Sequence, residues 1–252
     1  MKRYTLFILL AFLALTGRAQ ETVEKWFEQA NAAYNAGNYD SAVRLYEDIL
    51  TYDVESAPLY YNMGNAYYKK RDYPMAIYCY EKALKIDPSD DDARTNLEMA
   101  NLAIVDKIEP VPQSFLVKGW NGMRNWLSGD QWAYVSIVAF ALLLVAVGLF
   151  LRSGRMGMRK LGFFGGIVML IVFGLSVLFA TQFRKASLTE DQAIVMTPTV
   201  TVKSSPNTSS VDLFVLHEGT KVDLLDEADG WSKIKIANGS IGWLQTDFIR
   251  PF

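Results

Sequence analysis

The chain has almost none of the two residue types on which most metal and nucleophilic sites depend. Among its 252 residues, Cys79 is the only cysteine and His217 the only histidine. The usual zinc spacings need several Cys and His ligands, and a disulfide needs two cysteines. A glycine-rich phosphate loop and a nucleophile elbow are also missing from the sequence. These absences predict a protein that is not an enzyme and has no catalytic residues, metal or cofactor, with Cys79 as a small buried hydrophobe.

Charged residues are absent from two long apolar runs, Trp132–Leu151 and Leu161–Ala180, of 20 residues each. A helix of that length rises about 30 Å, which matches the hydrocarbon core of a bilayer. The alternative is a pair of buried core helices, but a globular core rarely contains two uncharged stretches this long. We therefore expect transmembrane helices at 132–151 and 161–181, joined by a basic cytoplasmic loop at 152–160.

The N-terminus resembles a secretory signal peptide, predicted at residues 1–19. Lys2 and Arg3 precede an apolar run, Leu6–Leu15, and Gly17-Arg18-Ala19 has the small-x-small pattern of a cleavage site. Whether it is cleaved or retained, such a segment directs the following residues outward. It predicts a multi-pass protein of the bacterial inner membrane, with both large soluble parts on the periplasmic side.

Charge is distributed unevenly along the chain. Residues 20–109 carry 9 basic and 17 acidic side chains, residues 187–252 carry 5 and 9, and residues 110–186 carry 8 and 1. Nucleic acid requires a basic face, so the acidic outer parts argue against it as a partner. The basic excess follows the predicted spans, where the lipid bilayer is the expected partner.

A repeat with a period of 34 residues precedes the apolar runs. Eight residues recur at this spacing: Asn31, Tyr34, Tyr39, Ala42, Tyr46, Glu47, Leu50 and Asp53 reappear as Asn65, Tyr68, Tyr73, Ala76, Tyr80, Glu81, Leu84 and Asp87. That period is typical of the tetratricopeptide repeat, a pair of antiparallel helices that stacks on its neighbours and exposes a concave groove. We predict an α-solenoid at 20–109, with units at 23–56 and 57–90 and a capping helix at 91–107.

Small residues in the second unit predict close helix packing. Gly64 and Ala76 stand where the two helices should cross, and Tyr80 should fill the gap between them. The cluster Asp90–Asp92 resembles an N-cap with favourable charges at a helix start, since the ligand loop of a calcium site is absent.

The first helix of each unit should line the peptide-binding groove. The predicted lining residues are Phe27, Asn31, Tyr34, Tyr61, Asn62, Asn65, Tyr68 and Lys69. Asparagine both donates and accepts hydrogen bonds, so it can hold an extended peptide backbone, and tyrosine supplies rigid contact area. For any one of these residues the alternative is a solvated helix surface. Some family members clamp a C-terminal carboxylate, but Phe27, Asp92 and Asn96 replace the basic residues of that clamp, so it is not expected here.

The segment 110–131 should be a juxtamembrane interfacial region. Apolar residues recur there at helical spacing among polar ones, as in a helix that lies on a membrane surface: Phe115, Leu116, Gly119 or Trp120, Met123, Trp126 and Leu127. The alternative is a loose linker. Gly162 and Gly166 form a GxxxG pair, a weak signal for close packing of the two spans.

The last part of the chain, 187–252, alternates at a period of two and predicts short strands. Asn238-Gly239 predicts a type I′ hairpin turn. Val202, Lys203 and Pro206, followed by Gly219, Trp231, Gly242 and Trp243, resemble a bacterial SH3-like domain, a small all-β barrel. Trp231 and Trp243 could form a ligand surface, although core positions are the more common outcome in so small a barrel, and His217 is expected in a turn.

The order of signal peptide, tetratricopeptide repeats, membrane hairpin and SH3-like barrel resembles the BatE-type proteins of the bacterial Bat aerotolerance operon. The resemblance implies an envelope protein associated with stress tolerance and with Bat-type partners that carry von Willebrand A-like domains, and indirectly with a MoxR-type ATPase. The sequence thus predicts a multidomain membrane protein that acts as an adaptor or scaffold. The alternative is a cell-wall tethering or sensing protein whose barrel binds peptidoglycan.

Overall fold

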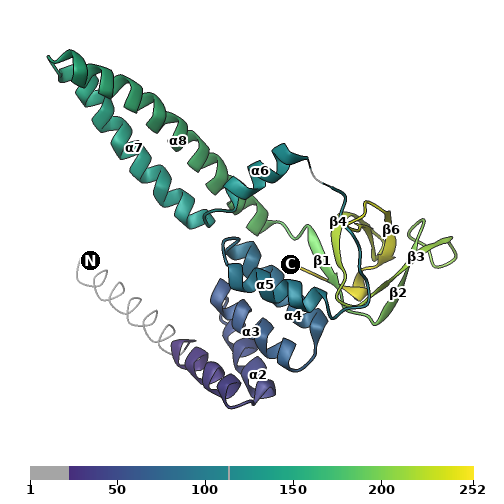
Figure 1. Cartoon of the computed structure of the whole chain (residues 1–252). Coiled ribbons are helices and arrows are strands. Elements are labelled where there is room, and N and C mark those ends of the chain that lie inside the picture. Colours follow the sequence, from purple (N-terminus) through teal and green to yellow (C-terminus); the bar gives the residue numbers. More distant parts are fainter. Residues whose placement is uncertain (1–22, 113) are drawn as a thin grey trace, which may run out of the picture.

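A computed structural model describes residues 23–112 and 114–252, which form a helical repeat region, a long helical hairpin and a β-barrel (Figure 1). The predicted signal peptide falls outside the described residues. The fold class is confirmed, since tetratricopeptide-like helices, two apolar helices that could span a membrane and a C-terminal antiparallel sheet are all present.

The repeat region is a stack of helices at 23–35, α2 (Tyr39–Leu50), α3 (Ala57–Lys69), α4 (Tyr73–Ile86) and α5 (Asp91–Asn101). Side chains set three of the helix starts: Ser56 caps α3, Asp72 caps α4 and Asp90 caps α5. Helix α5 ends before the predicted bound of 107. Lys107 turns back and donates a hydrogen bond of 2.7 Å to the carbonyl of Asn101, which caps this end of the helix.

The small residues of the second unit lie where two helices approach closely. A Cβ atom on Gly64 would lie 2.7 Å from Cε1 of Tyr80, and the Tyr80 ring is itself buried. Ala76 and Cys79 are fully buried in the same core. Burial raises the pKa of the Cys79 thiol, so this cysteine is an unreactive core residue.

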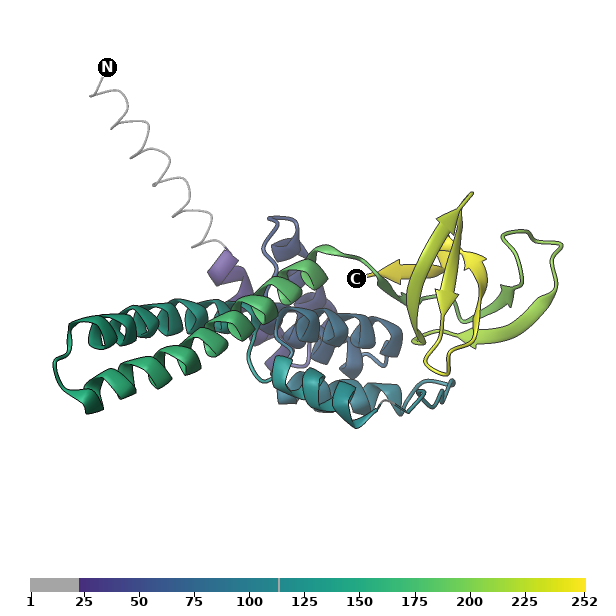
Figure 2. The same ribbon diagram turned by 90° about the horizontal axis from the view of Figure 1, so that it is seen from above.

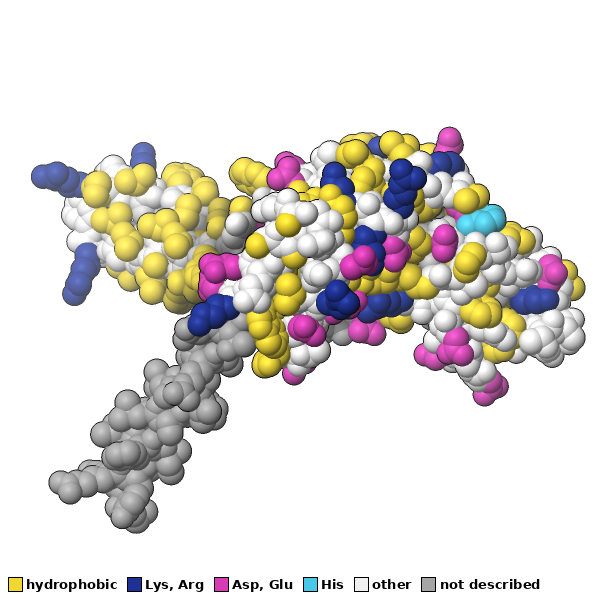
Figure 3. Space-filling model, turned by 90° about the horizontal axis from the view of Figure 1, so that it is seen from below, with side chains coloured by type: hydrophobic (Ala, Val, Ile, Leu, Met, Phe, Trp, Pro, Cys, Tyr) yellow, Lys and Arg dark blue, Asp and Glu magenta, His cyan; other side chains and the backbone are white. Residues whose placement is uncertain are grey.

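The hairpin consists of α7 (Gly129–Arg152) and α8 (Met156–Leu188), both long and apolar enough to cross a membrane. Both helices extend beyond the ranges 132–151 and 161–181, because Ser128 and Gln131 form a capping box before the first run and α8 begins inside the basic connector. Hydrophobic side chains cover the hairpin, and Lys and Arg side chains gather at its far tip (Figure 3).

One glycine of the GxxxG pair allows close packing of the hairpin. A Cβ atom on Gly162 would lie 2.6 Å from the carbonyl oxygen of Ala146 and 2.7 Å from the backbone nitrogen of Phe150. A Cβ atom on Gly166 would make only an ordinary contact at 3.7 Å. The backbones therefore approach most closely at Gly162, near the connector.

Helix α6 (Phe115–Arg124) lies beside the other end of the hairpin (Figure 2). The Trp120 ring packs edge-on against Phe179 of α8, with ring centroids 5.1 Å apart. The indole of Trp132 donates a hydrogen bond of 2.9 Å to the carbonyl of Arg124. The remaining apolar side chains are open, and Phe115 is 80% exposed.

The C-terminal part is an antiparallel sheet in the order β3-β2-β6-β5-β4-β1-β7. Its strands are β1 (Gln192–Val195), β2 (Thr199–Lys203), β3 (Asp212–His217), β4 (Lys221–Ala228), β5 (Trp231–Lys235), β6 (Ile241–Gln245) and β7 (Ile249–Pro251). Inward side chains such as Val202, Ile234 and Leu244 form its core. A Cβ atom on Gly242 would lie 2.4 Å from Val202, so the barrel needs glycine there.

The predicted type I′ turn at Asn238-Gly239 is wrong. That turn type needs positive φ at both central residues, and only Gly239 has one, at 89°. The loop is longer: Gly239 N–H donates to Ile236, and Ile236 N–H donates to Ser240. Positive φ at two adjacent residues occurs instead at Asp229 and Gly230, with φ values of 51° and 77°, between β4 and β5.

The barrel packs against the repeats through α4. Ile194 and Phe252 of the barrel belong to the buried cluster that forms the core of the repeat region. The Phe252 ring, 1% exposed, meets Tyr78 edge-on with centroids 6.1 Å apart. The guanidinium of Arg250 covers the other aromatic surface of Tyr78 at 4.4 Å from its centroid. Two residues of the barrel therefore complete the core of the repeat region.

Candidate functional site

A hydrogen-bonded group of asparagine and tyrosine links the first helices of the repeats. The phenol of Tyr80 donates to Oδ1 of Asn65 over 2.8 Å, and the side-chain amide of Asn96 donates to the same oxygen over 2.8 Å. Asn96 also donates a longer bond, 3.4 Å, to the hydroxyl of Tyr61. Helix α5 thus continues the row of first helices that α3 belongs to.

The same arrangement occurs one repeat earlier. Tyr46 donates to Oδ1 of Asn31 over 2.6 Å, and Asn62 donates to that oxygen over 3.1 Å. Two donors on Oδ1 fix the orientation of each carboxamide, so the amide group of Asn31 points away from these bonds. Among the described residues, Nδ2 of Asn31 donates no hydrogen bond, nor does Nδ2 of its repeat equivalent, Asn65. Each amide is therefore a donor available to a ligand.

A pocket of about 250 Å³ lies on this row of helices. It is lined by Tyr34, Tyr61, Asn65, Tyr68, Lys69, Asn96 and Met99, which include five of the eight predicted groove residues. Burial, together with the nearby phenols of Tyr39 and Tyr61, raises the pKa of Tyr34, so its hydroxyl stays protonated and can donate. Lys69 is the only charged residue in this lining. The pocket offers aromatic surface and neutral hydrogen-bonding groups.

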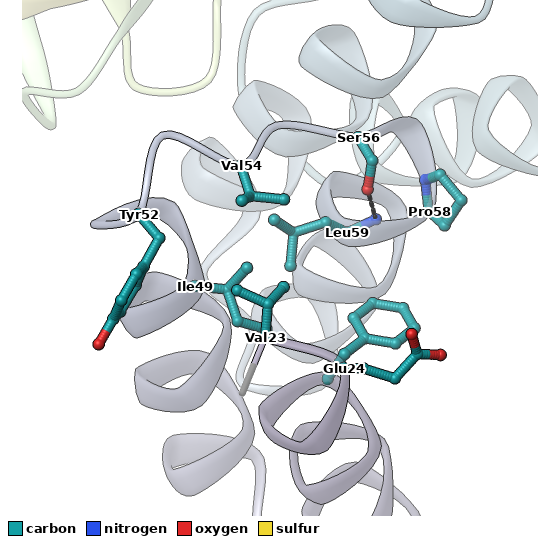
Figure 4. A pocket seen from close by; sticks show the side chains of 9 residues that line it. Val23, Glu24, Ile49, Tyr52, Val54, Ser56, Pro58 and Leu59 are labelled. Atoms are coloured by element: carbon teal, nitrogen blue, oxygen red, sulfur yellow. Dashed lines mark hydrogen bonds between the residues drawn. The ribbon is translucent and has the colours of Figure 1, made fainter. Parts of the chain in front are cut away.

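The other three predicted groove residues lie elsewhere. Asn31 and Asn62 form the bonded pair one repeat away. Phe27 lines a separate, larger pocket of about 630 Å³ at the N-terminal edge of the stack, with Val23, Glu24, Ile49, Tyr52, Val54, Ser56, Pro58 and Leu59 (Figure 4). In this view Val23, Ile49 and Leu59 point toward one another, which makes the pocket mainly apolar.

The barrel presents a second candidate surface. Trp231 and Trp243 are half-buried and lie on the outer face of the sheet, so the core positions expected for them were wrong. A pocket of about 210 Å³ on this face is lined by Thr199, Val200, Thr201, Lys203, Thr208, Trp231, Gln245 and Phe248. Trp243 does not line it; Lys233 lies over its ring at 5.9 Å from the centroid.

Asp106 joins the repeats to the barrel, a contact that the sequence did not predict. One carboxylate oxygen of Asp106 accepts hydrogen bonds of 2.7 Å from the backbone N–H of His217 and from the Thr220 hydroxyl. Its other oxygen lies 2.8 Å from Nδ1 of His217. A nearby ion pair joins Lys221 to Glu81 at 2.7 Å. His217 therefore ends strand β3 and contacts the repeat region, which no local pattern could indicate.

Within 23–112 and 114–252, no group of three or more His, Cys, Asp and Glu side chains is placed to hold a metal ion. Asp90 instead accepts a hydrogen bond of 2.9 Å from the backbone of Ala93, as an N-cap does.

Two segments match known families. Residues 57–90 match the tetratricopeptide repeat, and residues 198–250 match the bacterial SH3 domain. Both are typically interaction modules without catalytic activity, and a bacterial SH3 domain fits a protein of the cell envelope. A comparison with curated proteins gave no match.

Two solved structures are distantly similar to this chain. The Sgt2 TPR domain from Aspergillus fumigatus is 16% identical, with a TM-score of 0.31 over 64% of this chain and 82% of that one. A chain of a T3SS complex from Aeromonas hydrophila is 15% identical, with a TM-score of 0.33 over 66% of this chain and 94% of that one. Both likenesses are too distant to carry an argument about function.

Proposed function

We propose that this protein is an inner-membrane adaptor whose repeat groove binds a segment of a partner protein in the periplasm. The observation that carries the proposal is the pocket on the row of first helices, with its oriented Asn65 carboxamide and the rings of Tyr34 and Tyr68. Such a surface suits an extended peptide, because amide groups bond to a backbone and aromatic rings contact side chains.

The contact between repeats and barrel supports their placement on one side of the membrane. The two parts share a core around Phe252 and an ion pair between Glu81 and Lys221, although the hairpin separates them in sequence. Two spans return the chain to the side on which it started. The basic connector 152–160 then faces the cytoplasm.

The partners are proposed from the resemblance to the BatE-type proteins. They are membrane proteins of the Bat type with von Willebrand A-like domains, and through them a MoxR-type ATPase, in a complex for aerotolerance and stress. In this role the hairpin holds the groove at the membrane surface, where a juxtamembrane segment of a partner would reach it.

Affinity purification of the full chain from native membranes tests this role. A Tyr34→Ala/Lys69→Gln variant removes an aromatic and the charge from the pocket and should lose at least about tenfold of the co-purified partner, as loss of interface anchors does. A matched control, Tyr52→Ala/Lys70→Gln, removes the same groups outside this pocket. Equal loss from both variants would contradict the groove as the binding site.

A second role is favoured by the pocket beside Trp231. A bacterial SH3 domain suggests peptidoglycan binding, and the threonine hydroxyls and Trp231 of this pocket could hold a sugar or peptide of the wall. The full chain in detergent should then sediment with purified wall material. Trp231→Ala should reduce sedimentation more than Trp243→Ala, and absence of sedimentation by the parent chain would remove this role.

A further inference from the structure

A cavity of about 410 Å³ lies where the repeats, the hairpin and the barrel meet. Its basic lining residues are Lys85, Arg94, Arg124 and Lys221, and its acidic ones are Glu81 and Asp191. This excess of positive charge is unusual here, because both soluble parts of the chain are acidic overall. The end of α8 that leads into β1 lies next to the repeat helices at this point (Figure 1).

Two of the four cations, Lys85 and Arg124, form no salt bridge among the described residues. The ammonium of Lys85 donates a hydrogen bond of 2.6 Å to the carbonyl of Thr189, and the Arg124 guanidinium lies 5.4 Å from the centroid of the Phe183 ring. Lys221 is paired with Glu81. Burial lowers the pKa of Lys85, and the nearby Lys82 and Lys221 add to this effect, while Asp191 and Glu190 oppose it. An additional anion would stabilise the charged form of Lys85.

The cavity continues onto the side of the hairpin. A neighbouring cavity of about 400 Å³ shares Lys85 and Phe183 and extends to Asp130 and Ala133 of α7 and to Ala180 and Arg184 of α8. A cationic region therefore adjoins apolar hairpin surface. Arginine and lysine in this arrangement suit a phosphate group, and the apolar surface suits an acyl chain.

We propose that this junction cavity binds a phosphate group between Lys85 and Arg124, carried either by an anionic phospholipid or by a small soluble phosphate. The phospholipid source rests on the proposed membrane placement of the hairpin, whereas the soluble source does not. Bound phosphate would connect α4 with the segment that precedes α7, and so fix the angle of the repeat groove relative to the membrane.

Native mass spectrometry of the full chain in neutral detergent tests the proposal with phosphatidylglycerol, phosphatidylcholine and inorganic phosphate as probes. Phosphatidylglycerol should be retained over phosphatidylcholine. Lys85→Gln and Arg124→Gln should each weaken retention about fivefold, the factor that corresponds to about 1 kcal/mol for a cation near an anionic lipid. Lys118→Gln, on α6 outside the cavity, is the matched control and should retain lipid as the parent does.

The outcomes separate the two sources. Binding of inorganic phosphate that is weakened by the same two substitutions, without retention of lipid, supports a soluble phosphate. Equal retention by the parent, Lys85→Gln and Arg124→Gln chains, or an equal loss in Lys118→Gln, would overturn the proposal. Partner co-purification with the same variants reports on the groove separately, so failure of one proposal does not imply failure of the other.

Discussion

The phenol of Tyr80 donates a hydrogen bond of 2.8 Å to Oδ1 of Asn65, and Tyr46 and Asn31 repeat this contact one unit earlier at 2.6 Å. The bond joins the second helix of each unit to its first helix. It also orients the carboxamide that borders the proposed groove. The same residue pair therefore joins the two helices of a unit and orients a side chain of the proposed groove.

Replacing the two members of this pair should have unequal effects. Asn65→Leu leaves the hydroxyl of Tyr80, a residue 1% exposed, without its acceptor, and should destabilise the repeats by about 1–3 kcal/mol. Tyr80→Phe leaves Asn65 with the donor from Asn96, and should cost only about 0.5–1.5 kcal/mol. Urea unfolding of the full chain in detergent measures the loss of unfolding free energy in both variants. A larger cost for Tyr80→Phe would contradict this account.

Gly219 should be required for contact between barrel and repeats. It has a φ of 86°, and a Cβ atom there would lie 2.5 Å from Cγ2 of Ile104. Gly219→Ala should destabilise the docked arrangement by about 1–3 kcal/mol. Gly230→Ala is a matched control, because Gly230 has a φ of 77° and no atom within 4 Å of its added Cβ.

Hydrogen exchange of the backbone amides around Asp106 distinguishes these variants. Gly219→Ala should accelerate exchange at Asp106 and its neighbours, since the barrel separates from the repeats. Gly230→Ala introduces the same backbone strain without the clash. Exchange of the amides around Asp106 should therefore match the parent chain in this variant. Faster exchange in both variants would mean that backbone strain, not the contact with Ile104, explains the effect.

Docking of the barrel should weaken in acid. Burial acts to raise the pKa of Asp106, but hydrogen bonds from Thr220 and His217 outweigh it and lower the pKa. A carboxyl group with a lowered folded pKa stabilises above its unfolded value, about 4, and this stabilisation is lost as pH falls through the folded value. The ionisation of Asp106 should therefore not affect docking of the barrel on the repeats between pH 7 and 5. Docking should weaken below about pH 4.

Energy transfer between dyes on the repeats and the barrel measures this change. Dyes on Tyr52→Cys and Asp226→Cys, with Cys79→Ser to remove the native thiol, should show a decrease in transfer below about pH 4. Asp106→Asn should lower transfer already at pH 7 and flatten its acid dependence. An unchanged pH profile in Asp106→Asn would contradict a role for this carboxylate.

The turn inside the second unit contains strain that the first unit avoids. Arg71 has a φ of 63°, and the equivalent position one repeat earlier is Gly37, with a φ of 78°. A left-handed conformation costs a residue with a Cβ atom about 1–2 kcal/mol, part of which the greater flexibility of unfolded glycine offsets. Arg71→Gly should therefore raise stability by up to about 1 kcal/mol, and Gly37→Ala should lower it, both measured by thermal unfolding.

Much of the groove could be predicted because helical repeats transmit their period directly into space. Tyr34, Tyr61, Asn65, Tyr68 and Lys69 line one pocket because they occupy one face of successive first helices. Phe27 lies at another pocket, since it is in the first turns of the first helix, where no preceding repeat covers that edge. Asn96 also joins the groove, because α5 is the first helix of a partial third unit.

The barrel surface was less predictable. Period-two alternation assigns residues to two faces of a strand but does not say which face points inward. Trp231 and Trp243 were expected in the core because aromatic residues of so small a barrel usually lie there, and the structure places them on the outer face. The turn type predicted at Asn238-Gly239 was wrong for a related reason. Loop length and register decide the turn type as much as the residue pair does.

The sequence alone determined the elements whose signals are local: the repeated helix pairs, the two helices with long uncharged runs and the short strands. Periodicity and charge are properties of neighbouring residues. Only the tertiary structure decided how these elements meet. Asp106 and His217 are 111 residues apart, and Lys221 of the barrel borders one cavity with Lys85 and Arg124 only because the hairpin returns the barrel to the repeats. Contacts of this kind depend on chain reversal and packing, which no window of sequence contains.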